Sequence, residues 1–180
     1  MRFCFIFITL LIFASCADLD KTNQQQKISD LQKTTDSLLL VLNEANISDL
    51  NPEFNKGKEL LNNMAQLLQD DTIQETEAKK IANLSQLIDD FSDLEISFQD
   101  LKDELVIQQK TLKKLKQDIS EGNGKRDKYN SYIKFENEKV QKLDGLITDY
   151  KVLKTETTNK LALQIEIVND FYLSKKEEHQ

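Results

Sequence analysis

The fold is decided by residues 81–124, which read IANLSQLIDDFSDLEISFQDLKDELVIQQKTLKKLKQDISEGNG. Apolar side chains recur here in steps of three and four, the spacing of one buried seam along an α-helix. The seam consists of Ile81, Leu84, Ile88, Phe91, Leu94, Phe98, Leu101, Leu105, Leu112, Leu115 and Ile119. Glycine just past the last periodic residue favours a left-handed helix cap. Gly122-Asn123-Gly124 therefore predicts the end of one long helix and a turn into the next.

A second long seam follows this turn. It consists of Ile133, Val140, Ile147, Leu161 and Val168, with Tyr129, Leu143, Tyr150 and Phe171 at the companion position. Lys154 interrupts its seven-residue register. We therefore expect two helices of about 50 residues each, over 72–121 and 125–173, which pair as an antiparallel hairpin.

Two shorter seams precede the hairpin. The first consists of Ile28, Leu31, Thr35, Leu38, Leu42 and Ala45, and the second of Phe54, Gly57, Leu61, Met64 and Leu68. Between them, we expect Asn51 to cap a helix whose first residue is Pro52, and residues 72–75 (TIQE) fit a capping box for the third segment. If Pro52 only kinks or breaks the first helix, residues 27–173 form an elongated antiparallel three-helix bundle or coiled coil, followed by a polar tail over 174–180. If the chain reverses at Pro52, four unequal helices result.

The composition agrees with an all-α class and argues against an enzyme. The 180 residues include only four Gly and one Pro, which leaves little turn chemistry for a β-sandwich or a doubly wound sheet. The only histidine is His179, so the usual general base and transition-metal ligand are missing from the body of the chain. A sequence pI of about 4.9 also disfavours nucleic-acid binding. We expect a non-catalytic protein with no metal, no cofactor and no small-molecule substrate.

The first fourteen residues have the pattern of an export signal. Arg2 supplies a positive charge, and residues 3–14 (FCFIFITLLIFA) contain only one polar residue, Thr9. A membrane-spanning helix needs roughly 20 apolar residues, so this run is too short to be a stable span. It predicts a cleaved signal peptide.

The residues after the apolar run, Phe13-Ala14-Ser15-Cys16, resemble the lipobox of bacterial lipoproteins. Phe13 stands where the family usually has Leu, Val or Ile, so the lipobox is a relaxed one. The resemblance implies a signal peptide over 1–15, a lipid on Cys16, a short tether to residue 26, and a place on the bacterial cell envelope. Because Cys4 leaves with the signal, lipidation of Cys16 leaves no free thiol in an oxidising compartment.

Cleavage after Ala17 is the alternative, with Ser15 and Ala17 as the small pair. It predicts a soluble secreted interaction protein. Asn46 and Asn83 begin glycosylation sequons, so glycosylation there would mark such a protein from a eukaryote. Asp18 and Asp20 resemble the acidic surface-export signal of some Gram-negative lipoproteins, which implies an outer-membrane, surface-exposed location. In a solvated linker the same two charges need no function.

The charge is unevenly distributed. Residues 70–104 contain eleven acids and three bases, whereas residues 110–128 contain seven bases and three acids. In a three-helix arrangement the start of the first helix and the Gly122 turn share one end of the molecule. We hypothesise that a basic tip beside the anchor contacts anionic headgroups or a partner, although cations in the last turn of a helix also suit its dipole. The basic tip consists of Lys113, Lys114, Lys116, Lys125, Arg126 and Lys128.

Other clusters have a structural explanation. Asp89, Asp90 and Asp93 lie within one helical turn but fit a solvated face better than a metal site. Tyr129, Tyr132, Phe135 and Tyr150 occur at seam spacing and are expected in the core or on its flank. Residues 128–133 (KYNSYI) resemble the last helix of cell-wall-binding lipoproteins in composition only. We expect a lipid-anchored scaffold, spacer or binding module with a protein or cell-wall partner or a second copy. A periplasmic chaperone-like hairpin is a further alternative.

Overall fold

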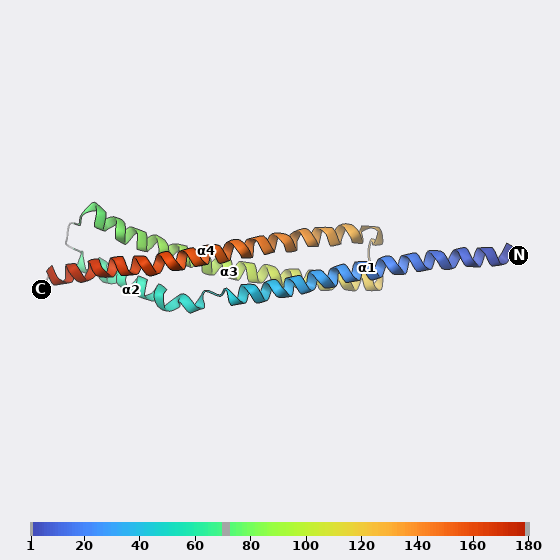
Figure 1. Ribbon diagram of the computed structural model, residues 1–180, viewed down its shortest axis with the longest axis horizontal. Helices are drawn as coiled ribbons and strands as arrows, with labels where there is room; N and C mark the ends of the chain where they lie inside the picture. Colours follow the sequence, from blue (N-terminus) through green and yellow to red (C-terminus); the bar gives the residue numbers. More distant parts are fainter. Residues whose placement is uncertain (1, 70–72, 179–180) are drawn as a thin grey trace. The chain divides into compact units, whose positions relative to one another are not determined.

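The computed structural model describes the backbone of residues 2–69 and 73–178 and, within these, the side chains from Leu19 onward except that of Asp49. This part of the chain contains four α-helices and no β-strand (Figure 1). The α-helices are α1 (Arg2–Glu44), α2 (Asn51–Leu67), α3 (Glu75–Glu121) and α4 (Tyr129–Glu178). Two short 3-10 helices, η1 (Ser48–Leu50) and η2 (Arg126–Lys128), precede α2 and α4. The predicted all-α class is confirmed.

The chain divides into two compact units. Unit 1 contains Met1–Val41 and Lys102–Leu146, and therefore α1 to Val41, the end of α3 and the start of α4. Three hydrogen bonds join these segments: the amide of Gln24 donates to Asn130 at 3.2 Å, that of Gln109 to Asp36 at 2.7 Å, and that of Gln108 to Glu136 at 2.9 Å. Together with the Tyr129 hydroxyl, which donates to the carbonyl of Asp118, they show that α3 runs antiparallel to α4.

The core of unit 1 follows the predicted seams. Its buried apolar side chains are Ile28, Leu31, Leu38, Leu105, Leu112, Ile119, Tyr129, Ile133, Val140 and Leu143. Four polar side chains, those of Gln24, Thr35, Gln108 and Glu136, are also buried. Thr35 donates to the carbonyl of Leu31 in the same helix, and the other three bond across helices. Every buried polar side chain of this unit thus has a partner, as a low-dielectric core requires.

Unit 2 contains Leu42–Leu101 and Ile147–Gln180, and so α2, the first part of α3 and the second part of α4. Phe54 of α2 stacks on Phe91 of α3 with ring centroids 4.5 Å apart. At Gly57 the absent side chain lets α2 approach its neighbours, because a Cβ there would lie 2.9 Å from Ile88 Cδ1. Between α3 and α4, the amide of Gln164 donates to the carbonyl of Lys80 at 2.8 Å.

The break after the first helix begins earlier than predicted. Helix α1 ends at Glu44, and Asn46 accepts a hydrogen bond from the Ser48 N–H with its side chain, which turns the chain. Pro52 lies in the first turn of α2 as expected, but the cap residue is Leu50 and not Asn51. The physical reason is that η1 continues directly into α2, so Asn51 already has helical dihedral angles.

The start of the third helix is also displaced from its prediction. Helix α3 begins at Glu75, and the Glu77 carboxylate accepts a hydrogen bond from the Gln74 N–H at 3.1 Å. The acidic half of a capping box is therefore supplied by Glu77. Thr72 of the predicted TIQE box lies outside the described residues.

The predicted glycine turn after α3 is confirmed. Gly122 has a φ of 73° and Gly124 a φ of 79°, the left-handed region that glycine adopts without strain. The N–H of Gly122 bonds to the carbonyl of Ile119 and that of Asn123 to the carbonyl of Asp118, a Schellman cap of α3. The chain then re-enters a helix through η2.

Both ends of the helical region extend beyond the predicted limits. Leu19 to Gln26, expected as part of a tether, is helical, and Gln24 is only 5% exposed. Helix α4 continues to Glu178 through the segment expected as a polar tail, where Lys175 and Glu178 form an ion pair at 2.7 Å. Because both end segments are polar, apolar spacing did not predict that they are helical. Side-chain hydrogen bonds and ion pairs stabilise the helices there.

Candidate functional site

The candidate site is the end of unit 1 that carries the glycine turn. The side chains of Cys16 and Asp18 lie outside the described residues. Leu19 is the first described side chain and is 72% exposed. The carboxylate of Asp20 accepts a hydrogen bond from the Gln24 amide at 3.2 Å, and the same amide group donates to Asn130 of α4. Helix α1 is thus held against α4 from Gln24, eight residues after Cys16.

A small pocket lies between residues 20–24 of α1 and the glycine turn. It has a volume of about 270 Å³ and is lined by Asp20, Lys21, Gln24, Ile119, Glu121, Gly122, Arg126 and Tyr129. Residues 20–24 therefore lie beside the Gly122 turn. The expectation that the first helix begins at this end is wrong, because α1 begins at Arg2, but its residues Asp20 to Gln24 do lie beside the turn.

The turn is held by two side chains from the start of α4 and η2. The Tyr129 hydroxyl lies within hydrogen-bonding distance of the carbonyls of Asp118 and Asn123. The guanidinium of Arg126 donates to the carbonyl of Gly122 at 3.0 Å. These contacts satisfy the carbonyl of Asp118 in the last turn of α3 and those of Gly122 and Asn123 in the turn that follows. One member of the basic tip, Arg126, thereby has a structural role as well as a charge.

The structure brings the predicted basic tip to this end of unit 1. Lys113, Lys114, Lys125, Arg126 and Lys128 are exposed, and Lys116 is half-buried. None of these six cations forms a salt bridge with another described residue. Their charge is therefore directed to solvent, where it can meet an anionic surface.

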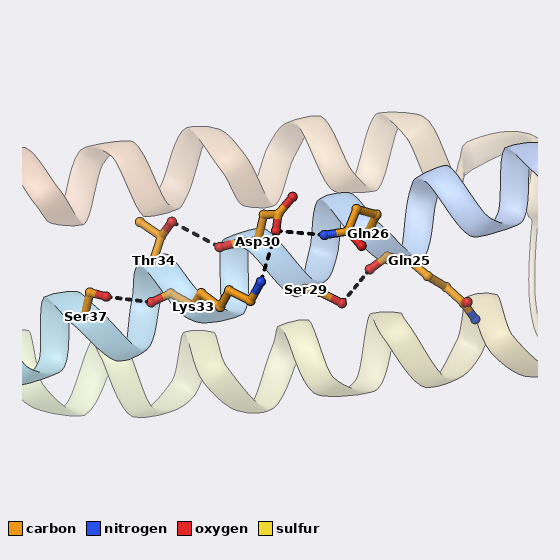
Figure 2. A network of polar contacts seen from close by, with 7 residues as sticks. All are labelled: Gln25, Gln26, Ser29, Asp30, Lys33, Thr34 and Ser37. Atoms are coloured by element: carbon orange, nitrogen blue, oxygen red, sulfur yellow. Dashed lines mark hydrogen bonds and ion pairs between the residues drawn. The ribbon is translucent and has the colours of Figure 1, made fainter.

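A larger groove runs between α1 and α4 in unit 1. It has a volume of about 530 Å³ and is lined by Asp20, Lys27, Asp30, Leu31, Thr34, Asn130, Ile133, Lys134 and Asn137. Its α1 wall belongs to a local network in which the Asp30 carboxylate accepts from Gln26 at 2.9 Å and lies 3.7 Å from Lys33 (Figure 2). Thr34 donates to the Asp30 carbonyl of the same helix. Asp30 and Thr34 thus line the groove, while their hydrogen bonds and ion pair are made within α1.

The other clusters of the sequence give no chemical site. Asp90 accepts a hydrogen bond from Gln86 one turn earlier, and among the described residues no group of three or more potential ligands is placed to hold a metal ion. Of the four aromatic residues at seam spacing, Tyr129 and Tyr150 are buried as expected. Tyr132 and Phe135 lie on the flank and are exposed.

Lys154, which interrupts the seam of α4, contacts the break after α1 in unit 2. Its amine donates to the carbonyl of Asn46 at 2.6 Å, and the neighbouring Tyr150 hydroxyl donates to the carbonyl of Ala45 at 3.2 Å. Both bonds satisfy backbone groups where α1 has ended. In the sequence, Lys154 stood out only as a polar residue at an apolar seam position, and Tyr150 only as a companion residue of that seam.

In residues whose placement is described, no helix is both long and apolar enough to cross a membrane. No protein-family model matches the chain, and neither the characterised proteins nor the solved structures include a significant match to it.

Proposed function

We propose that the protein is a lipid-anchored cell-envelope protein whose helical body serves as a non-catalytic scaffold, spacer or binding module. The observation that carries this proposal is Cys16, which follows a short apolar run and the small residues Ala14 and Ser15. With Cys4 removed in the signal peptide, Cys16 would be the only cysteine of the mature chain.

The packing of α1 supports a short connection between lipid and body. Gln24 is buried and bonded to Asn130, and a helix rises about 1.5 Å per residue, so the eight residues from Cys16 span about 12 Å. A lipid on Cys16 would therefore hold the glycine turn and the basic tip close to the bilayer. This short connection is consistent with a helical body that serves as a scaffold or binding module at the membrane surface.

The finer fold that we propose is one antiparallel three-helix bundle, with α1 and α2 as successive parts of the first member. In support, α3 and α4 have 47 and 50 residues, and each would be on the order of 70–75 Å long. Small-angle X-ray scattering of the chain without its signal should give a maximum dimension of that order or more. A much smaller maximum dimension would contradict the elongated bundle.

Mass spectrometry of the mature N-terminus, after expression in a bacterial host, tests the anchor. We expect the chain to begin at Cys16 with a diacylglyceryl group on the sulfur, and Cys16→Ala to accumulate as an unprocessed precursor. An unmodified chain that begins at Asp18 would instead establish the secreted alternative. Protease treatment of intact cells then shows which side of the envelope carries the body.

Asp18 and Asp20 can be separated in the same assay. Because Asp20 bonds to Gln24 and so contributes to the packing of α1, Asp18 is the better candidate for an export signal. We expect Asp18→Ala to reduce protease accessibility of the lipidated protein on intact cells. A loss for Asp20→Ala alone would argue against this assignment.

A further inference from the structure

One side of α4 in unit 1 exposes large apolar side chains beside lysines. Tyr132, Phe135, Lys139, Lys142 and Leu146 follow one another in alternating steps of three and four, so they share one side of the helix. Tyr132 is 43% exposed, Phe135 54% and Leu146 42%. We call these five residues the α4 face.

The α4 face is not part of the unit 1 core. The core uses a different side of the same helix, on which Ile133, Val140 and Leu143 are buried. Ile107 of α3, 55% exposed, extends the apolar area. Ile107 and Phe135 each precede one partner of the Gln108–Glu136 hydrogen bond, which brings the two exposed side chains to the same level of the unit. Several exposed large apolar side chains on neighbouring helices are typical of a contact surface.

The chemistry of the α4 face is that of a bilayer interface. Lys139 places its amine 4.7 Å from the centroid of the Phe135 ring and 3.9 Å from the carboxylate of the buried Glu136, while Lys142 is exposed. Aromatic and aliphatic side chains enter the headgroup region, while lysine stems lie along them and their amines stay among the phosphates. Lys142 and the exposed cations of the basic tip form no salt bridge with another described residue, so this part of a chain with a net charge of −7 is complementary to an anionic surface.

The position of the α4 face agrees with that surface. Asn130, which accepts the hydrogen bond from Gln24, lies two residues before Tyr132. The basic tip residues Lys125, Arg126 and Lys128 precede the face on the same segment and are exposed. Tyr132, Phe135 and these cations therefore lie at the end of unit 1 where Gln24 of α1 bonds to α4.

We propose that the α4 face, together with the basic tip, binds the surface of an anionic lipid bilayer. The inference rests on the proposed function, because a lipid on Cys16 would hold this end of unit 1 at the membrane. Each lysine near an anionic surface strengthens binding by about fivefold, and the aromatic side chains add apolar burial. The lipid anchor and the α4 face then form two membrane contacts, which together give a more stable attachment than either one.

Vesicle cosedimentation of the unlipidated chain from Leu19 onward tests the proposal, since every described side-chain contact lies within 19–178. The variants are Lys139→Glu/Lys142→Glu and Tyr132→Ser/Phe135→Ser. The control, Lys56→Glu/Lys151→Glu, makes the same change of net charge at two exposed lysines of unit 2. Circular dichroism checks that each variant keeps its helix content.

On vesicles of phosphatidylglycerol mixed with phosphatidylcholine, we expect the wild type and the control to bind alike. The Lys139→Glu/Lys142→Glu variant should bind at least tenfold more weakly, and Tyr132→Ser/Phe135→Ser severalfold more weakly. Pure phosphatidylcholine should bind none of them well. Equal binding by all four proteins, or binding that ignores lipid charge, overturns the proposal.

A depth measurement provides a second readout. The chain from Leu19 onward contains no cysteine, so a polarity-sensitive fluorophore can be attached at Phe135→Cys or at the exposed control site Leu40→Cys. We expect anionic vesicles to shift the emission to shorter wavelength at position 135 and not at position 40. No shift at 135 contradicts membrane contact.

Sedimentation velocity separates the membrane from a second copy as occupant. If the variants of the α4 face dissociate a dimer and leave vesicle binding unchanged, the face is an interface between copies and the membrane proposal is wrong. The vesicle assay uses a chain without Cys16, so weak vesicle binding would contradict only the membrane contact of the α4 face. The mass of the mature N-terminus tests only the lipid anchor. The two proposals are therefore contradicted by different results.

Discussion

At the scale of single residues, Tyr150 is the group in unit 2 whose ionisation should alter stability. Its hydroxyl donates to the carbonyl of Ala45, its ring lies 6.1 Å from that of Phe98, and burial raises its pKa from 10.0 to about 12. In the unfolded chain the phenol ionises near pH 10, whereas in the folded chain it stays neutral to about pH 12. Its contribution to stability is thus complete below pH 10 and is lost as the pH rises from 10 to 12.

Tyr150→Phe isolates this effect. Near pH 8 the variant should be less stable by about 1 kcal/mol, because the Ala45 carbonyl loses its donor. As the pH rises from 10 to 12 the wild type should lose up to about 2–3 kcal/mol relative to the variant, so that Tyr150→Phe becomes the more stable protein at the upper end of this range. Urea unfolding of both proteins at several pH values measures the difference. A constant difference up to pH 12 would show that Tyr150 is not protected from ionisation.

Two glycines in helices differ in their surroundings and should respond oppositely to substitution. A Cβ on Gly57 would lie 2.9 Å from Ile88 Cδ1 and 3.6 Å from Ile165 Cδ1, whereas a Cβ on Gly145 would meet nothing within 4 Å. Gly57→Val should destabilise the protein by about 1–3 kcal/mol through crowding. Gly145→Ala should stabilise it by about 0.5–1 kcal/mol, because alanine suits a helix better than glycine. Thermal unfolding of both variants is the measurement, and stabilisation by Gly57→Val would contradict close packing of α2.

At the scale of elements, the end of α3 depends on the left-handed conformation of Gly122. Alanine at this position should destabilise the protein by about 1–2 kcal/mol, because a Cβ is strained at a φ of 73°. Asparagine, which enters this region more readily, should be destabilising by less. Chemical denaturation of Gly122→Ala and Gly122→Asn tests the order. Equal stability of both variants and the wild type would mean that the Schellman cap is dispensable.

The link between α3 and α4 in unit 1 includes a buried polar pair, Gln108 and Glu136. Gln108→Leu leaves the buried Glu136 carboxylate without the amide that now donates to it, with Lys139 3.9 Å away. We expect a loss of about 1–3 kcal/mol. The double variant Gln108→Leu/Glu136→Leu should recover most of this loss, since two apolar side chains need no partners. A double variant that is less stable than Gln108→Leu would show that the polar pair itself is stabilising.

This pair also marks the limit of prediction from the sequence. Apolar spacing was sufficient for the long helices, since nearly every predicted seam residue of α3 and α4 is buried. Gln24, Gln108 and Glu136 were missed because a polar residue in a seam enters the core only when another helix supplies its partner. In α2, Leu60 is buried, whereas the predicted Leu61 is only half-buried. Positions 60 and 61 are both leucine, so apolar spacing does not determine which of the two faces the core.

The candidate site was predicted in part for the same reason. The sequence indicated the basic tip, since the glycine turn determines where the two long helices meet. It also predicted that the first helix begins there, whereas α1 begins at Arg2 and only its residues 20–24 lie beside the turn. It did not indicate that Tyr132 and Phe135 are exposed, because their spacing also suits a core. Only the rotation of α4 in unit 1, set by the burial of Tyr129, Ile133 and Val140, distinguishes the two possibilities.

At the scale of the whole molecule, the continuity of α3 and α4 should couple the two units. Each of these helices contributes one part to unit 1 and the other to unit 2 without a break in its backbone. Unfolding one unit alone would leave helix ends without packing, and helices keep little stability without it. We therefore expect the units to unfold together in a single transition.

Hydrogen exchange of the Gln108→Leu variant tests this coupling. The substitution lies in unit 1, yet it should accelerate amide exchange in the unit 2 core, for example around Leu84, Phe91 and Val168, by nearly the factor measured around Leu112. The exposed substitution Lys113→Ala, one residue from Leu112, is the control and should change exchange in neither unit. If exchange accelerates only around Leu112, the two units unfold independently and the continuity of α3 and α4 does not couple them.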